Sequence, residues 1–167
     1  RFGVLFQGSN SVASPQIRNR GTMAGNICSA LPSADSPPGL LCLGAKLVCV
    51  SSRGERIVDM EDFFLGPRQT ALAEDELLKE IQVPEMPEGG RGAYIKLSMR
   101  SRMDLAVVGV GVVVAVSDGV LRHVRIGLGS AAPIPVRARR AEGALVGENV
   151  EKKTIAEAGR IAAESST

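Results

Sequence analysis

The chain of 167 residues contains no tryptophan, one tyrosine and four phenylalanines. Aromatic rings are the side chains that most often stack on planar ligands. With so few of them, the chain cannot hold a flat heterocycle by extensive stacking. Any ring that it binds must contact aliphatic side chains or another chain.

Histidine occurs once and cysteine three times. His123 has no second histidine or cysteine nearby, so neither a metal site nor a nucleophile–histidine pair is expected. Cys28, Cys42 and Cys49 lack the CxxC spacing of zinc and iron–sulfur sites, and their odd number argues against a disulfide framework. We expect buried free thiols in a reducing cytoplasm. No catalytic residue and no metal ligand is predicted.

Charge and hydrophobic patterning argue against two further classes of function. The formal net charge of +2 is too small to indicate binding to nucleic acid or to a membrane surface. The longest apolar run, residues 105–116, is too short to span a membrane, and Gly109 and Gly111 interrupt it. No secretory signal is visible. These features predict a globular cytoplasmic protein without a membrane span.

A short run of small and amide residues is the most informative segment. Residues 16–27 read QIRNRGTMAGNI, and PSAD follows at 32–35. Gly21 and Gly25 permit positive φ and close approach of an anion, while Thr22 and Asn26 add side-chain donors. The run is neither a Walker A loop nor GxGxxG. Because Gly and Asn also punctuate ordinary turns, the residues alone leave open a tight turn between two elements.

The order of these residues resembles the flavin-binding subunit of the molybdenum hydroxylases, the family of xanthine dehydrogenase and the medium subunit of aerobic carbon monoxide dehydrogenase. The family core T-[IL]-G-G-N is TMAGN at 22–26 here, with Ala24 in place of the first glycine. Colinear matches continue along the chain: G-x-R at 54–56, D-F-F-x-G at 62–66, E-L-L at 76–78, [FY]-x-K-x-x-x-R-x-x-x-D-[IL]-A at 94–106, and the glycine, proline, arginine and glutamate pattern at 127–142. Such a series is far more specific than any one motif.

The resemblance implies a function and partners. In this family a molybdopterin-binding large subunit oxidises the substrate. Electrons then pass through [2Fe–2S] clusters on a small subunit to FAD, and on to NAD, a quinone or oxygen. The chain would be the FAD-binding, electron-transfer component of such an enzyme.

A second hypothesis starts from segments that members of the family have in addition to those seen in this sequence. Relatives carry an upstream α/β half with a glycine loop that binds part of the FAD, and further helix after the last residue here. The chain would then be a truncated, flavin-free interaction or assembly module, or a relic, that retains only the fold and is inactive alone. Its uncovered apolar surface would favour self-association into a homo-oligomer.

The resemblance also implies which residues contact FAD: Ala13, Thr22, Ala24, Gly25, Asn26, Ser29, Asp35, Leu78 and Lys96. Thr22, Gly25 and Asn26 would hold the diphosphate, Asp35 a flavin hydroxyl, and Lys96 the pyrimidine edge of the ring. The residues alone leave plainer roles open: Asp35 as a turn or cap residue, Leu78 as a core leucine and Lys96 as a solvated strand-edge lysine. Ala24 would cost about 1 kcal/mol if its position required positive φ.

The pattern of elements predicts an α+β fold in two parts. Residues 1–10 include LFQG, which resembles a picornaviral protease recognition sequence and predicts a tag or disordered leader. Residues 11–86 would form the second FAD-binding subdomain, with a loop at 21–35 and strands at 46–51, 55–58 and 76–83. Residues 92–167 would form a truncated α+β domain, in which a three-stranded antiparallel sheet at 93–100, 106–116 and 120–128 packs with two helices at 137–145 and 151–164.

Overall fold

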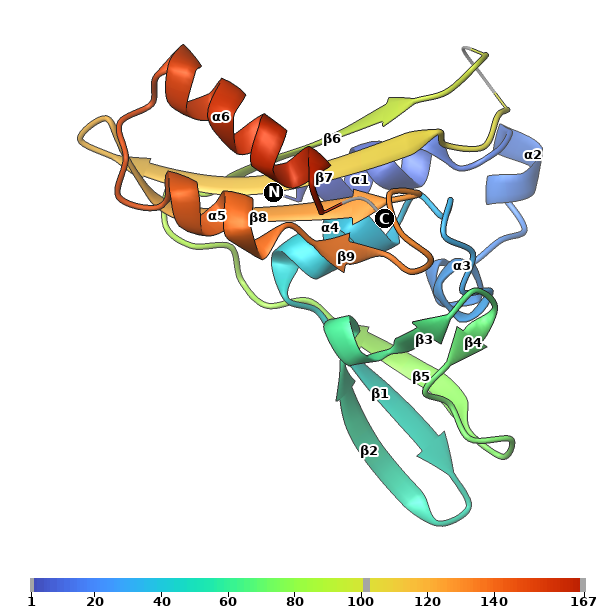
Figure 1. Ribbon diagram of the computed structural model, residues 1–167. Helices are drawn as coiled ribbons and strands as arrows, with labels where there is room; N and C mark the ends of the chain where they lie inside the picture. Colours follow the sequence, from blue (N-terminus) through green and yellow to red (C-terminus); the bar gives the residue numbers. More distant parts are fainter. Residues whose placement is uncertain (1, 101–102, 166–167) are drawn as a thin grey trace.

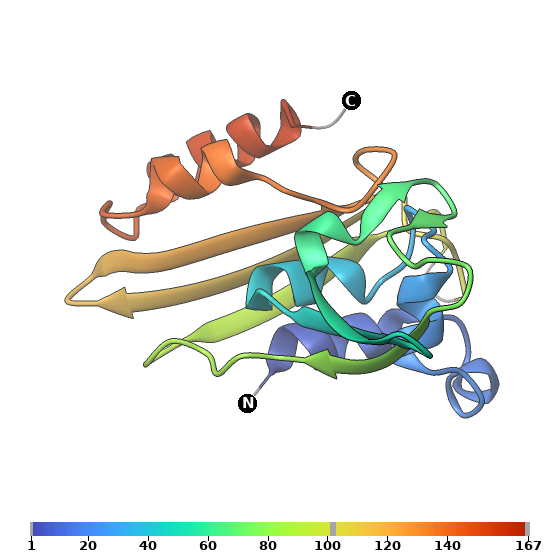
Figure 2. The same ribbon diagram turned by 90° about the horizontal axis from the view of Figure 1, so that it is seen from below.

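The computed structural model describes residues 2–100 and 103–165 and has an α+β architecture (Figure 1). Its largest layer is an antiparallel sheet in the order β6-β7-β8-β9, formed by Arg91–Leu97, Val108–Ser117, Val120–Gly129 and Val136–Arg137. Helices α1 (Gly3–Ser11) and α4 (Pro37–Leu43) lie on one face, and α5 (Arg139–Leu145) and α6 (Lys152–Ala163) lie on the other (Figure 2). The predicted fold class is confirmed, and the two-residue strand β9 extends the three predicted strands.

The two faces of this sheet differ because successive strand residues point in opposite directions. On β7 the even-numbered valines at 108–116 line the side of α6. The odd-numbered positions Gly109 and Gly111 pair across the ladder with Gly129 and Gly127 of β8. One face is therefore covered by branched side chains, whereas the other has a strip without side chains.

Helix α4 occupies that glycine strip, and all seven of its residues are buried. Pro38 lies directly on the strands: a Cβ added to Gly127 would stand 2.4 Å from the Pro38 carbonyl oxygen, and one added to Gly111 would stand 3.0 Å from the Pro38 carbonyl carbon. The helix begins with proline in its first turn and ends at Gly44, whose φ of 65° is left-handed. The close approach of helix and sheet therefore depends on glycine.

Three other strands form a smaller antiparallel sheet in the order β2-β1-β5, made by Gly54–Asp59, Lys46–Ser51 and Leu77–Gln82. The 3-10 turn η1 (Met60–Asp62) and the hairpin of β3 (Phe64–Gly66) and β4 (Gln69–Thr70) connect β2 to β5. The core of this part is built around fully buried side chains: Ile27, Leu40, Leu47, Cys49 and Phe63. The predicted strands in this part are confirmed, with small shifts at their ends.

The prediction that residues 1–10 form a tag or disordered leader is wrong as to disorder for residues 3–10, whereas Arg1 lies outside the described residues. They contribute helix α1, which packs on β6. Val4 is 0% exposed and shares a core with Leu43 and Tyr94, and Gly8 is also buried. Val4 and Gly8 are four residues apart and so lie on one helix face. A segment that resembles a protease recognition sequence can therefore still form a packed helix.

A partly buried ion-pair cluster joins η1 to the larger sheet. Arg137 of β9 donates to Glu142 of α5 at 3.0 Å and to Glu61 of η1 at 2.7 Å. Glu142 is 6% exposed and also accepts the Ile126 backbone N–H. Burial alone raises the pKa of Glu61, but the hydrogen bonds from Arg137 and Arg139 outweigh it and lower the pKa overall. The cluster therefore fixes how the two parts of the chain meet.

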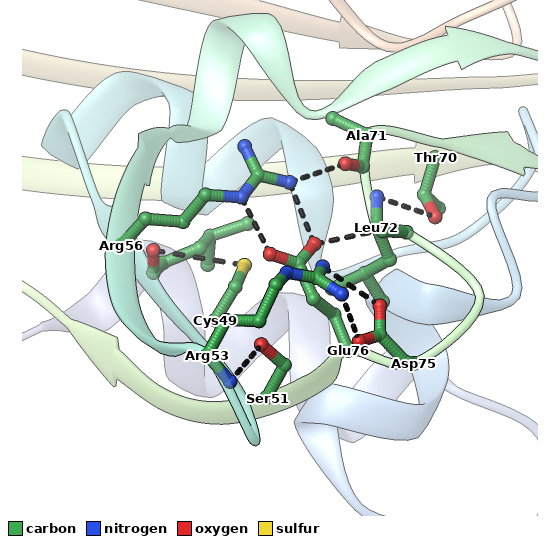
Figure 3. A network of polar contacts seen from close by, with 11 residues as sticks. Cys49, Ser51, Arg53, Arg56, Thr70, Ala71, Leu72, Asp75 and Glu76 are labelled. Carbon is green, nitrogen blue, oxygen red and sulfur yellow. Dashed lines mark hydrogen bonds and ion pairs between the residues drawn. The ribbon is translucent and has the colours of Figure 1, made fainter.

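A second polar network braces the smaller sheet (Figure 3). The Arg56 guanidinium donates two hydrogen bonds of 2.7 Å to the Glu76 carboxylate, and Arg53 pairs with Asp75 beside it. Glu76 also accepts the Ala73 backbone N–H. These bonds, that of Arg56 first, lower the pKa of Glu76 to about 2. The network therefore requires Glu76 to be ionised.

Replacement of Glu76→Gln should remove a pH-dependent contribution to stability. The folded-state pKa of about 2 lies below the ordinary 4.5, so the carboxylate stabilises the fold fully above pH 4.5 and loses this effect as the pH falls toward 2. The urea midpoint of the wild type should exceed that of the variant at neutral pH, and the difference should shrink below pH 4.5. Glu74→Gln is the matched control and should leave the pH profile unchanged. A constant difference down to pH 2 would contradict the assignment.

Gly127→Ala should destabilise the fold by about 1–3 kcal/mol, because the new methyl group would collide with backbone rather than with a movable side chain. Urea unfolding measures this loss. Gly143→Ala on α5 is the control: nothing lies within 4 Å of its Cβ position. Alanine is favoured over glycine in helices by about 0.5–1 kcal/mol, so this variant should be slightly stabilised. Equal losses in the two variants would count against the packing described for Pro38.

Candidate functional site

The glycine and amide run forms a helix rather than an open loop. Thr22 is the N-cap of α3 (Met23–Cys28), and its hydroxyl oxygen accepts the Gly25 N–H at 2.9 Å. Ala24 lies inside this helix, so alanine carries no positive-φ cost there. Gly21 and Gly25 also lie outside the left-handed region. The predicted loop at 21–35 therefore contains a helix, and the positive φ that Gly21 and Gly25 permit is not used. The sequence T-x-x-G is typical of a helix cap as well as of a nest.

Thr22, Gly25 and Asn26 line one cleft of about 330 Å³, which we call the Thr22 cleft. The Thr22 hydroxyl accepts one bond and keeps its own proton to donate. The Asn26 amide oxygen accepts the Ser36 hydroxyl at 2.5 Å, which leaves the amide NH₂ as a donor. Arg18 adds a positive charge to the same wall. The cleft thus combines neutral donors with one cation, a set that suits an anion.

Ala13 and Lys96 line a second cleft of about 800 Å³, which we call the Lys96 cleft. Arg18 lines this cleft as well, so the two clefts share a wall. Its guanidinium donates to the carbonyl oxygens of Val12 at 2.7 Å and Ala13 at 3.1 Å. Ala13 has a φ of 41°, which is strained for a residue with a Cβ. Arg18 therefore holds a strained turn at the junction of the two clefts.

A buried charge cluster stands behind the Lys96 cleft. Asp35 is 5% exposed, and its carboxylate accepts the Tyr94 hydroxyl at 2.6 Å and the Lys96 ammonium at 2.9 Å. Lys96 also donates to the Ser11 carbonyl oxygen at 3.2 Å. Burial first, and then the hydrogen bond to Asp35, raises the pKa of Tyr94 well above its ordinary value of 10. The interpretation of Lys96 as a solvated strand-edge lysine is therefore wrong.

The other candidate residues lie apart from both cleft walls. The Ser29 hydroxyl donates to the Asn26 carbonyl oxygen at 2.7 Å, at the end of α3. Leu78 on β5 packs against the core of the smaller sheet, in agreement with its plainer role as a core leucine. Sequence reasoning missed Tyr94 and Arg18. The signal for Tyr94 was available, because residues 94 and 96 must share one face of a strand.

The cysteines and the histidine support no second chemistry. Cys28, Cys42 and Cys49 are free thiols, and burial raises the pKa of Cys42 to about 12. Burial also lowers the pKa of His123, with a smaller effect from Arg125. Within residues 2–100 and 103–165, no group of histidine, cysteine and acidic side chains could hold a metal ion. No helix in these described ranges is long and apolar enough to cross a membrane.

Two family models match the chain. Residues 4–86 match the FAD-binding domain in molybdopterin dehydrogenase, and residues 93–167 match the CO dehydrogenase flavoprotein C-terminal domain. The first match begins inside α1, consistent with α1 as part of the fold.

The chain is similar to subunits of xanthine dehydrogenase and of carbon monoxide dehydrogenase. The chain is 38% identical over 140 residues to a xanthine dehydrogenase FAD-binding subunit of Escherichia coli O157:H7, covering 83% of the chain and 48% of the relative. It is 35% identical over 155 residues to the carbon monoxide dehydrogenase medium chain of Hydrogenophaga pseudoflava, covering 93% and 54%.

Comparison with solved structures also finds a CO dehydrogenase. A chain of the reconstituted CO dehydrogenase of Oligotropha carboxidovorans superposes with a TM-score of 0.90 at 34% identity, covering 95% of this chain and 55% of the other. The chain spans about half the length of the curated relatives it matches. It belongs to the family of FAD-binding subunits of molybdopterin dehydrogenases, the family that its sequence motifs resemble.

Proposed function

We propose that the chain contributes the FAD-binding, electron-transfer component of a molybdenum hydroxylase. The observation that carries this proposal is the pair of adjoining clefts. One is lined by Thr22, Gly25 and Asn26, the other by Ala13 and Lys96, and Arg18 joins them. The family matches support the same ligand. FAD, when bound, would supply the redox chemistry.

The residues on the cleft walls fit the polar parts of FAD. The hydroxyl proton of Thr22, the amide of Asn26 and the charge of Arg18 suit a diphosphate, which neutral donors and arginine both stabilise. Asp35 lines neither cleft, and both its carboxylate oxygens accept bonds from β6, so its bond to a flavin hydroxyl stays a prediction from the resemblance. The ammonium of Lys96 would favour negative charge that develops on a reduced ring beside it. The chain's own part is to bind, orient and charge-match the cofactor.

The partners follow from the same family. The relatives named medium chain are parts of larger enzymes, so we expect a molybdopterin-binding large subunit and a [2Fe–2S] small subunit to flank this chain. The electrons would leave for NAD, a quinone or oxygen. The free thiols suit a reducing cytoplasm.

A second function is favoured by one observation: donors and acceptors of the candidate site are already bonded within the chain. The Gly25 N–H bonds to Thr22, and both Asp35 oxygens bond to β6. Because the matched relatives are about twice as long, the chain alone could present only part of a larger site. It would then be a flavin-free interaction or assembly module, inactive alone, with exposed apolar side chains such as Leu97 and Met99 available for self-association.

Titration of the purified chain with FAD separates the two functions. The proposed function predicts quenching of FAD fluorescence on binding, and release of flavin from the protein on denaturation. A folded chain that leaves FAD fluorescence unchanged would favour the flavin-free module. Light scattering in the same buffer tests self-association, which a strict monomer at high concentration would contradict.

Asn26→Asp should weaken FAD binding at least about tenfold, because a carboxylate would face the diphosphate where an amide donates. The variant keeps an oxygen that accepts the Ser36 hydroxyl, so the fold should be preserved. Fluorescence titration measures the affinity and thermal unfolding checks the fold. Asn149→Asp is the matched control: Asn149 pairs with Val120 in an isolated β-bridge and lines neither cleft, so this variant should bind as the wild type does. Equal affinities of both variants would argue against a diphosphate in the Thr22 cleft.

A further inference from the structure

Tyr94 sits in a socket that the sheet builds for it. Its register partner on β7 is Gly111, and the next pair on the same face joins Lys96 to Gly109. A Cβ added to Gly109 would stand 2.4 Å from the Tyr94 hydroxyl oxygen, so the phenol occupies the space that glycine leaves. The Tyr94 backbone N–H donates to the Gln7 side chain at 2.7 Å. Both the ring and its backbone are therefore fixed.

The Tyr94 hydroxyl begins a linear series of contacts toward the cleft. It donates to one oxygen of Asp35 at 2.6 Å, and the other Asp35 oxygen accepts the Lys96 ammonium at 2.9 Å. The side chains of Asp35 and Lys96 are 6% and 13% exposed, so water competes weakly for these bonds. Because a carboxylate is planar, fixing one oxygen also fixes the direction of the other.

We propose that Tyr94 is a positioning residue: its hydroxyl orients the Asp35 carboxylate, which in turn holds the Lys96 ammonium at the wall of the Lys96 cleft. The use of this arrangement for flavin rests on the proposed function. The arrangement itself does not depend on the proposed function, since every contact in it lies within the chain. Lysine has a long and flexible side chain, and a fixed ammonium can act on a ligand only where it is held in place.

Competitive labelling of lysine amines tests the proposal on the flavin-free chain. An ammonium must leave its carboxylate before it reacts as a free amine, so trace acetylation followed by mass spectrometry reports how firmly each lysine is held. Tyr94→Phe removes the hydroxyl and keeps the ring. The acetylation rate of Lys96 should rise about fivefold or more, because a hydrogen bond to a charged group is lost.

Lys46 and Lys79 are internal controls in the same sample. Both make exposed ion pairs, with Asp59 and Glu55, and both should keep their wild-type rates. An unchanged rate at Lys96 would overturn the proposal. A rise by the same factor at all three lysines would also overturn it, because the hydroxyl would then merely stabilise the fold.

Gly109→Ala is the second variant, in case Tyr94→Phe folds poorly. It keeps the phenol but displaces the hydroxyl, and it should raise the Lys96 rate in the same selective way. Unchanged labelling of Lys96 in this variant would contradict the socket.

In the FAD titration, Tyr94→Phe should bind several-fold more weakly than the wild type. A wild-type chain that binds no FAD would contradict the proposed function alone, because the labelling comparison needs no flavin.

Discussion

The seating of α4 on the glycine strip is the contact on which the rest of the structure depends. Pro38 touches the backbone of β7 and β8, which is possible only because Gly111 and Gly127 have no side chains. This contact brings Asp35, two residues before the first residue of the helix, against β6. Without it, the carboxylate from the first part of the chain and the ammonium of Lys96 would not meet. The candidate site is therefore a product of long-range packing rather than of one motif.

Much of the fold could be predicted from local pattern. The β-branched run of β7 alternates with a period of two, and the turn at Asp118-Gly119 marks its hairpin with β8. Long-range packing could not be predicted in the same way. Helix α1 is predicted as a leader because it contains LFQG, and its role becomes clear only from the burial of Val4 against the larger sheet. Strand β9 is too short to have a periodic signal.

The candidate site also has a part that local sequence predicts and a part that only the fold reveals. Thr22, Gly25 and Asn26 lie together because they share one turn of chain, and their sequence indicates that directly. The contact of Asp35 with Tyr94 and Lys96 spans about sixty residues of sequence, which no spacing rule anticipates. Arg18 was also missed, because its importance comes from the strained φ of Ala13 that it stabilises. Colinear family motifs located the site, while its supporting contacts required the fold.

The bond between Gln7 and the Tyr94 N–H has a consequence beyond the site. Strand β6 lies at the end of the larger sheet, where an unpaired strand edge can recruit a strand from a neighbouring molecule and start aggregation. The Gln7 amide oxygen already accepts a main-chain donor in the middle of that strand. An incoming chain would have to break this bond and displace α1 before it could extend the ladder. The helix thus guards the molecule against uncontrolled sheet growth.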